Sequence, residues 1–470
     1  MDEATGVLAS APPADRRSKV GLVIYFAALT GVCALVFAPS VRAGFFEDDF
    51  GYLNVTLAPG WWHTSPTWDL AAQVFRPITI LAIGTQRELF GFHPQSFHVV
   101  ALGLLLVQGI LLYLVGRRLG LARVGSLAAS TVLMLHTTNG WSLAWTASTS
   151  SLYSVIFGLV VVWLLASEQP GRRQVVGATA VFVLALLSRE ISMTLPFIVL
   201  VIRYSIGDGA WRARARQAFR ETTPLFVVLG AYLAARLGFS AYARSKPEAP
   251  RLVPILDWTS FRETLPDVPA HLRDLVTLAT SPFYAVYDPA TGLHFPAAVF
   301  VVAVVVWAVI VGLVVREARA GRWIGSVGLA WFVIGILPPL FLQPDMTYGN
   351  YTDMALPGLA LAVGAIVESL SRSLPARLRP VMGGLGVAVL VALAVSGGNY
   401  LVDPGPPLIA RAAFLEAQAR REYPDPAPGS TIVIRGSIPE DVLWTSNGDL
   451  FRAMYDDPDL QVVFDPNPGG

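Results

Sequence analysis

The sequence is poor in charged residues and almost free of cysteine. Only 14% of its 470 residues are Asp, Glu, Lys or Arg, whereas 54% are hydrophobic; soluble globular chains carry about 25% charged residues. A soluble fold could not bury that much apolar surface. The single cysteine, Cys33, excludes an intrachain disulfide and a cysteine-based metal site. A Walker-type Gly-rich loop is also missing, which argues against an ATP-driven transporter.

Apolar runs recur along the whole chain. Many have about 18 or more residues, enough to cross roughly 30 Å of hydrocarbon as a helix. We therefore expect an all-α polytopic membrane protein with about eleven transmembrane helices. The two short runs, 124–137 and 175–187, predict tilted or partly buried helices. The expected spans are 20–41, 97–115, 124–137, 142–166, 175–187, 192–206, 223–243, 296–315, 323–342, 353–370 and 381–400.

Every second connection between these spans is basic. The positive-inside rule makes six such segments cytoplasmic, which places the N-terminus in the cytoplasm and the C-terminus outside it. The first apolar run is longer than the about 7 to 15 residues of a signal-peptide core, so we expect an uncleaved first helix. The six basic segments contain Arg16, Arg17 and Lys19; Arg117, Arg118 and Arg123; Arg172 and Arg173; Arg212, Arg214, Arg216 and Arg220; Arg316, Arg319 and Arg322; and Arg372, Arg377 and Arg379.

This topology divides the chain into three parts. Residues 1–19 form a cytoplasmic segment, 20–401 a transmembrane domain, and 402–470 an extracytoplasmic tail. Within the transmembrane domain, the first large outer loop (42–96) carries aromatic stretches that suit interfacial helices, and the second is 244–295. Two strand-like runs in the tail predict a small α/β unit, too small to stand alone and therefore packed on the membrane part.

The most informative stretch is GFFEDDFGY, residues 44–52, directly after the first span. Glu47, Asp48 and Asp49 stand between aromatic residues at the expected membrane interface. Charges at that depth are costly unless they are paired or used. The alternative is a solvated loop start that only marks the end of a helix. A second charged pair, Arg189-Glu190, lies between two spans. A purely structural ion pair is as good an interpretation of these two residues as a functional role.

Several short motifs occur in a characteristic order. The order resembles the polytopic glycosyltransferases of the GT-C fold, and within them the bacterial relatives of protein O-mannosyltransferases, including the TMTC-type enzymes, in the ArnT-like superfamily. Order and spacing agree over about residues 20–200, and the rest only in helix count and topology. The chain departs from these relatives at Arg189, where they often have Lys, and at 348–351, where they often have an Arg-Tyr pair. The motifs are Asp48-Asp49, Arg76-Pro77, Phe90-Gly91-x-x-Pro94-x-x-Phe97-His98, Leu135-His136, Ser188-Arg189-Glu190 and Leu337-Pro338.

The resemblance implies transfer of a sugar, with inversion, from a polyprenyl-phosphate donor to a hydroxyl of an extracytoplasmic protein, glycan or lipid. It also implies a bacterial inner (plasma) membrane location. A carboxylate beside the hydroxyl can take its proton, and the phosphate leaves without protonation, so one carboxylate suffices. We assign the base to Asp48, with Asp49 as its neighbour and Glu47 and Glu190 in support.

Cations must meet the lipid phosphate. Arg76 and Arg189 rank first because arginine binds phosphate bidentately and stays charged. His98 is a third candidate, although an interfacial histidine at a helix start is an equally good interpretation. The six histidines show no ligand spacing, so we expect no cofactor, while a divalent metal at the acidic cluster stays open. The expected partners are the donor, the acceptor and membrane lipids, without nucleic acid.

Two other functions stay open. A transporter or lipid flippase usually shows charged or Gly/Pro-interrupted segments in mid-membrane and two related halves. This chain concentrates its acids and cations at one membrane face and shows no repeat. A non-catalytic assembly factor that binds a partner through its outer loops is compatible with the same sequence.

Overall fold

The structure is a computed structural model. It describes residues 16–46, 48–57, 76–244, 262, 265–280, 286–288, 292–294, 297–341, 349–402, 407–435 and 448–465.

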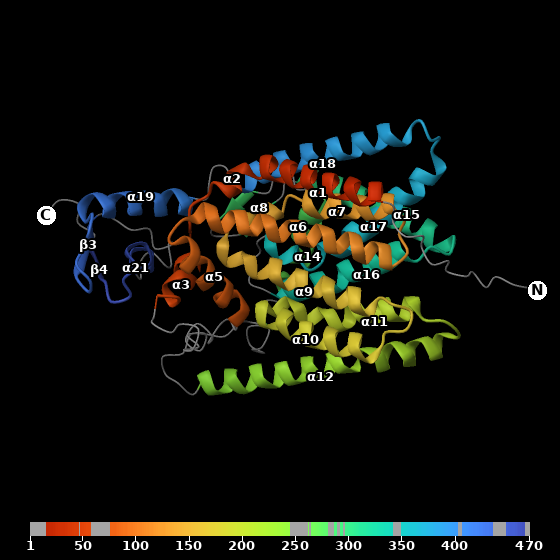
Figure 1. The fold of residues 1–470 in the computed structure, drawn as a ribbon, viewed down its shortest axis with the longest axis horizontal. Coiled ribbons are helices and arrows are strands. Elements are labelled where there is room, and N and C mark those ends of the chain that lie inside the picture. The colour runs from red at the N-terminus through yellow and green to blue at the C-terminus, as the bar shows by residue number, and fades with distance from the viewer. Residues whose placement is uncertain are drawn as a thin grey trace, which may run out of the picture.

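Long helices run side by side along the longest axis of the molecule (Figure 1). Five stretches in the described part are long and apolar enough to cross a membrane. The expected class, an all-α polytopic membrane protein, is confirmed, whereas the count of eleven spans stays a prediction. The long helices are α1 (Arg16–Val36), α6 (Pro94–Arg118), α7 (Arg123–Met134), α9 (Thr149–Leu165), α10 (Arg172–Ser188), α11 (Leu195–Ile206), α12 (Trp211–Arg244), α15 (Ala297–Arg319), α16 (Ile324–Ile336), α17 (Leu356–Ser373) and α18 (Arg379–Val402).

Several short elements, among them α2 (Ala38–Val41), α3 (Asp48–Val55), α5 (Pro77–Phe90) and α8 (Asn139–Ala144), lie toward one end of this bundle, which we call the tail end because it carries the C-terminal tail (Figure 1). The first residues of α1 lie at the opposite end, which we call the basic end. Further short elements are η1 (Thr146–Ser148), η2 (Glu190–Thr194), η4 (Leu265–Asp267), α14 (Val268–Thr280), β1 (Val286–Asp288), β2 (Gly292–His294), η5 (Pro338–Phe341) and η7 (Gly349–Thr352).

The predicted span 142–166 corresponds to an apolar stretch, Thr146–Leu165, that is long enough to cross a membrane, but the backbone is interrupted before it. Trp145 has extended backbone angles and separates α8 from η1 and α9. The following residues, TASTSS, are rich in Ser and Thr, whose hydroxyls compete for backbone groups. Thr149 donates such a bond to the carbonyl of Thr146 over 2.6 Å. The break creates a polar turn inside the tail end of the bundle.

Helix α17 lies close to two neighbours because glycines face each other. A Cβ atom on Gly328 of α16 would lie 2.6 Å from the carbonyl oxygen of Gly358. A Cβ atom on Gly364 would lie 2.5 Å from the carbonyl oxygen of Gly125 in α7. Small residues let membrane helices approach closely enough for backbone packing. This contact fixes the bundle from which the loops of the tail end emerge.

The tail forms the small α/β unit that its two strand-like runs predict. It contains α19 (Pro407–Glu422), β3 (Thr431–Arg435), α21 (Asp449–Tyr455) and β4 (Gln461–Asp465). Strands β3 and β4 pair in parallel, with Thr431 opposite Gln461. The buried side chains of Ile432 and Phe451 belong to the same apolar cluster as Phe46 and Phe50 beside α3. The tail therefore packs on the loop that follows the first helix.

Polar contacts reinforce this docking. The amide of Asn54 in α3 donates to Asp449 over 2.9 Å, and Arg87 of α5 forms an ion pair with Asp456. Both contacts join the tail to the elements that carry the acidic cluster. The tail therefore buttresses α3 and α5.

The topology prediction can be tested with one cysteine at each end of the bundle. Ala417 of α19 and Ala320 after α15 are both exposed. Cys33 is fully buried and should not react with a thiol reagent. An impermeant thiol reagent should label Ala417→Cys in intact cells and Ala320→Cys only after lysis, because the basic end is expected to be cytoplasmic. The opposite labelling pattern would reverse the predicted orientation.

Candidate active site

The two aspartates of the acidic cluster occupy different environments at the start of α3. Consecutive helical residues point about 100° apart. Asp48 is half-buried, whereas Asp49 is fully buried. The Asp49 carboxylate accepts hydrogen bonds from the backbone N–H groups of Ala147, over 2.7 Å, and Phe46, over 3.2 Å. Asp49 therefore fixes α3 against η1 and has no open face for a substrate.

Burial dominates the electrostatics of Asp49. It raises the pKa of this carboxyl well above its usual value, although the backbone donors of Ala147 and Phe46 oppose the shift. Asp48 keeps partial contact with solvent. Burial is the main cause that raises the pKa values of Tyr52 and Tyr351, and the negative charge of Asp48 adds to the shift. Asp48 is therefore the aspartate that faces the remaining polar groups.

Arg76 and Glu190 form an ion pair across 114 positions of sequence. Nε of Arg76 lies 3.0 Å from Oε2 of Glu190, and a terminal guanidinium nitrogen contacts Oε1. Arg76 precedes the first residue of α5, where Pro77 sets the helical backbone angle. Burial raises the pKa of Glu190, but the positive charge of Arg76 outweighs it and holds the pKa at about 2. Arg76 also hydrogen-bonds the hydroxyl of Tyr52.

Arg189 lies next to Glu190 in sequence but has different partners. Its backbone is extended between α10 and η2, and successive side chains of extended backbone point to opposite sides. The guanidinium donates to the hydroxyl of Ser151 and stacks 4.8 Å from the ring centre of Tyr351. Burial and the charge of Arg76 lower its pKa. Its Nε atom is buried without a hydrogen-bond partner in the described ranges.

Asp353 belongs to the same polar cluster as Arg189 and was not predicted from the sequence. It is 4% exposed, and its Oδ2 atom accepts a hydrogen bond from Ser142 over 2.7 Å. Its charge acts on Arg189. The available signal was a single acidic residue at the start of the apolar run 353–370. Tyr52 and Tyr351 were also missed, because tyrosines are common at any membrane interface.

These side chains converge at the tail end from four distant parts of the chain. Asp48 and Arg76 both act on the hydroxyl of Tyr52, and Arg76 in turn pairs with Glu190. Tyr351 links Asp48 and Arg189 in the same way. The charge of Asp48 acts on its hydroxyl, and Arg189 stacks on its ring. The arrangement places a partly exposed carboxylate near two guanidinium groups. Such a site can accept a proton on one side and stabilise a phosphate on the other.

One predicted residue, His98, lies elsewhere. His98 is 1% exposed, and its Nε2 atom lies 3.1 Å from the carbonyl oxygen of Ala43, so it anchors α6 to the segment before α3. This position fits the structural interpretation of His98 better than phosphate binding. Glu47 lies outside the described residues. Within the described ranges, no three His, Cys, Asp or Glu side chains are grouped to hold a metal ion.

A multi-pass helical bundle with interfacial helices in its first outer loop and a polar site at that end is the fold of GT-C glycosyltransferases. The chain has this fold, as comparison with solved structures confirms. Comparison with protein-family models and with curated proteins finds no match.

The solved structures that are similar to this chain include an oligosaccharyltransferase and ArnT. One is the oligosaccharyltransferase of Archaeoglobus fulgidus, tethered with an acceptor peptide, with 13% identity and a TM-score of 0.53 over 94% of this chain. The alignment covers 64% of that enzyme, so the chain spans less than two thirds of its length. The other is ArnT from Cupriavidus metallidurans in the apo state, with 16% identity and a TM-score of 0.52 over 95% of this chain and 86% of that one. At these identities the likeness concerns the fold.

Proposed function

We propose that this protein is a membrane glycosyltransferase that moves a sugar from a polyprenyl-phosphate donor to an acceptor hydroxyl with inversion. The acceptor is a hydroxyl of an extracytoplasmic protein, glycan or lipid, and the site faces the extracytoplasmic side of a bacterial inner membrane. The observation that carries the proposal is the convergence, on a GT-C fold, of the half-buried Asp48 with Arg76 and Arg189.

Asp48 is the general base in this proposal. It takes the proton of the acceptor hydroxyl while the oxygen bonds to the anomeric carbon, and the bond from that carbon to the phosphate oxygen breaks. The electron pair of the broken bond stays with the phosphate. Asp49 supports the reaction indirectly, because its bonds to Ala147 and Phe46 hold the first turn of α3 in place. A base must be held in reach of its proton, so this anchoring matters for rate.

Arg189 is the principal phosphate ligand in this proposal. The charge of Arg76 is already balanced by Glu190 in a two-contact ion pair. Arg189, in contrast, stacks on Tyr351 and leaves its Nε–H without an acceptor in the part of the chain that the structure describes. A departing phosphate supplies the missing acceptor and the opposite charge. Arg76 then holds Tyr52 and Glu190 at the edge of the same site.

Arg189→Ala should weaken donor binding about ten- to a hundredfold, the usual effect of losing a charge-assisted hydrogen bond in a partly desolvated site. The measurement is a titration of purified protein with the donor. Arg420→Ala is a matched control, because that arginine pairs with Glu416 on the tail surface and is 52% exposed. Equal donor affinity of wild type and Arg189→Ala would remove Arg189 from the phosphate site.

The proposed activity can be tested with purified protein and a panel of radiolabelled polyprenyl-phosphate sugars. A transferase should convert one of them into free polyprenyl phosphate, and Asp48→Asn should slow the release by about two to four orders of magnitude. In sealed vesicles, movement of the labelled lipid between leaflets without release of the sugar would favour a flippase and overturn the proposal.

A further inference from the structure

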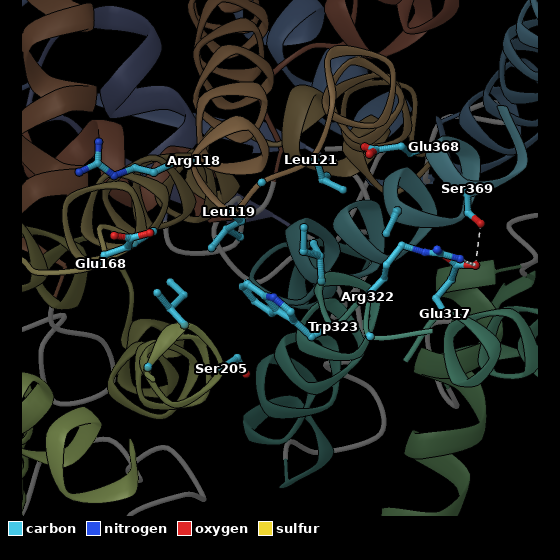
Figure 2. A pocket seen from close by; sticks show the side chains of 18 of the residues that line it. Arg118, Leu119, Leu121, Glu168, Ser205, Glu317, Arg322, Trp323, Glu368 and Ser369 are labelled. Atoms are coloured by element: carbon cyan, nitrogen blue, oxygen red, sulfur yellow. Dashed lines mark hydrogen bonds and ion pairs between the residues drawn. The ribbon is translucent and has the colours of Figure 1, made fainter. Parts of the chain in front are cut away.

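A second cavity lies at the basic end of the bundle, far along the helices from the proposed active site. Its volume is about 630 Å³. It is walled by the connections that follow α6, α9, α11 and α15 and by the last turns of α17. Figure 2 shows Arg118 and Glu168 on one side of it and Glu317, Arg322 and Ser369 on the other. None of these groups takes part in the proposed transfer reaction.

One wall of this cavity is held rigidly by Arg203. That side chain is 1% exposed, forms an ion pair with Glu221, and donates to the carbonyl oxygens of Leu165, Ser167 and Glu168. Three bonds from one guanidinium fix the turn after α9 in a single conformation. The side chain of Ser167 therefore has a preorganised position at the cavity wall.

The same wall carries two polar atoms without hydrogen-bond partners in the described ranges. They are Oγ of Ser167 and Nε of Arg118. The Arg118 guanidinium stacks 5.0 Å from the ring centre of Trp163, which fixes its plane. Buried donors without an acceptor are costly, and a serine hydroxyl and an arginine N–H are each donors for an oxyanion. A phosphate oxygen satisfies both atoms.

The opposite wall needs no ligand. Glu317 is 2% exposed and is bonded by Arg322 and Ser369. Glu368 accepts from the backbone N–H of Ala122 over 2.6 Å and pairs with Arg372. These carboxylates are satisfied internally. They give the cavity a closed, polar wall of fixed shape.

Two further carboxylates remain exposed around the cavity, those of Glu168 and Asp208. They repel a lone anion but attract a cation. Apart from Ser205, the rest of the lining is apolar or glycine and includes Leu119, Trp323 and Ile324. The cavity stands at the ends of the apolar helices, at the depth where lipid headgroups and tryptophan side chains meet. A ligand that joins a phosphate, an ammonium group and apolar chains fits all three features.

We propose that this cavity binds the headgroup of an aminophospholipid. The phosphate accepts from Arg118 and Ser167, and the primary ammonium group faces Glu168 and Asp208. The site is independent of the proposed glycosyl transfer. A bound lipid would contact four connections between helices at the basic end. It thereby stabilises the bundle on the side away from the active site.

The test uses purified, delipidated protein with phosphatidylethanolamine, phosphatidylcholine or phosphatidylglycerol of identical acyl chains. Native mass spectrometry should show phosphatidylethanolamine retained about tenfold more strongly than the other two, because only it offers both a phosphate and a hydrogen-bonding ammonium group. Glu168→Gln should remove most of this preference, and Arg118→Gln should weaken the retention of all three lipids. Arg173→Gln, an exposed arginine at the same end, should leave both the preference and the retention intact.

The lipid-free thermal midpoint of each variant shows whether it folds, and Ser167→Ala replaces Arg118→Gln if the arginine variant does not. The proposal is overturned by equal retention of the three lipids by the wild type, or by unchanged retention in folded variants of both Arg118 and Glu168. It is also overturned if inorganic phosphate displaces phosphatidylethanolamine at equal concentration, because the site then recognises a free anion.

Discussion

Asp48→Asn should lower turnover by about two to four orders of magnitude while donor affinity stays within about twofold of wild type. The amide keeps the size and hydrogen bonding of the carboxyl group but cannot take the acceptor's proton. Asp48 is half-buried at the start of α3, so the substitution removes a base without opening a cavity. The measurement is single-turnover release of polyprenyl phosphate alongside a donor titration.

Two variants separate chemistry from folding in this experiment. Asp49→Asn should act mainly on thermal stability, because the Asp49 carboxylate holds the N–H groups of Ala147 and Phe46. Asp425→Asn alters an exposed tail residue and should leave both turnover and stability unchanged. Near-normal turnover in folded Asp48→Asn would exclude Asp48 as the base and leave Glu47 as the next candidate of the cluster, because Asp49 is fully buried. Normal turnover after single replacement of each of the three acids would exclude the whole acidic-cluster mechanism.

The helical class and the tail could be predicted from the sequence because each depends on local patterns. Hydropathy over about 20 residues decides whether a segment crosses a bilayer, and alternating apolar residues mark short strands. The runs at 430–435 and 460–464 therefore correspond to β3 and β4, which pair in parallel. The break at Trp145 was missed because its apolar surroundings hide the Ser/Thr-rich turn that follows.

The partners within the site could not be predicted in the same way. The adjacent charges of Arg189 and Glu190 suggested a local ion pair, yet Glu190 pairs with Arg76, 114 positions away. The extended backbone at Arg189 separates the neighbouring side chains, and only the packing of α5 against α10 brings Arg76 into reach. Asp353 was missed for a similar reason, because its role depends on Ser142 of α8. Long-range partners of this kind are set by the tertiary fold.

The Arg76–Glu190 pair should make a large contribution to stability. Glu190→Ala leaves a guanidinium whose side chain is only 13% exposed without its carboxylate. Removal of one partner of a buried pair costs about 3 to 5 kcal/mol, and partial solvent contact places this pair at about 3 kcal/mol. Replacement of both residues by Met should recover most of that loss, because no unpaired charge remains. The measurement is the free energy of unfolding of the purified protein in mixed micelles.

A surface pair of the same chemistry is the matched control for this prediction. Glu416 and Arg420 on α19 are 35% and 52% exposed and lie 3.0 Å apart, so Glu416→Ala should cost only about 0.5 kcal/mol. The wild type should also show an acid dependence that Glu190→Ala lacks. The folded pKa of Glu190, about 2, lies below its unfolded value of 4.5. The contribution of Glu190 to the free energy of unfolding is therefore complete above about pH 4.5 and is lost as the pH falls toward 2. Equal losses in Glu190→Ala and Glu416→Ala, with parallel pH profiles, would show that the Arg76–Glu190 pair behaves as a solvated surface contact.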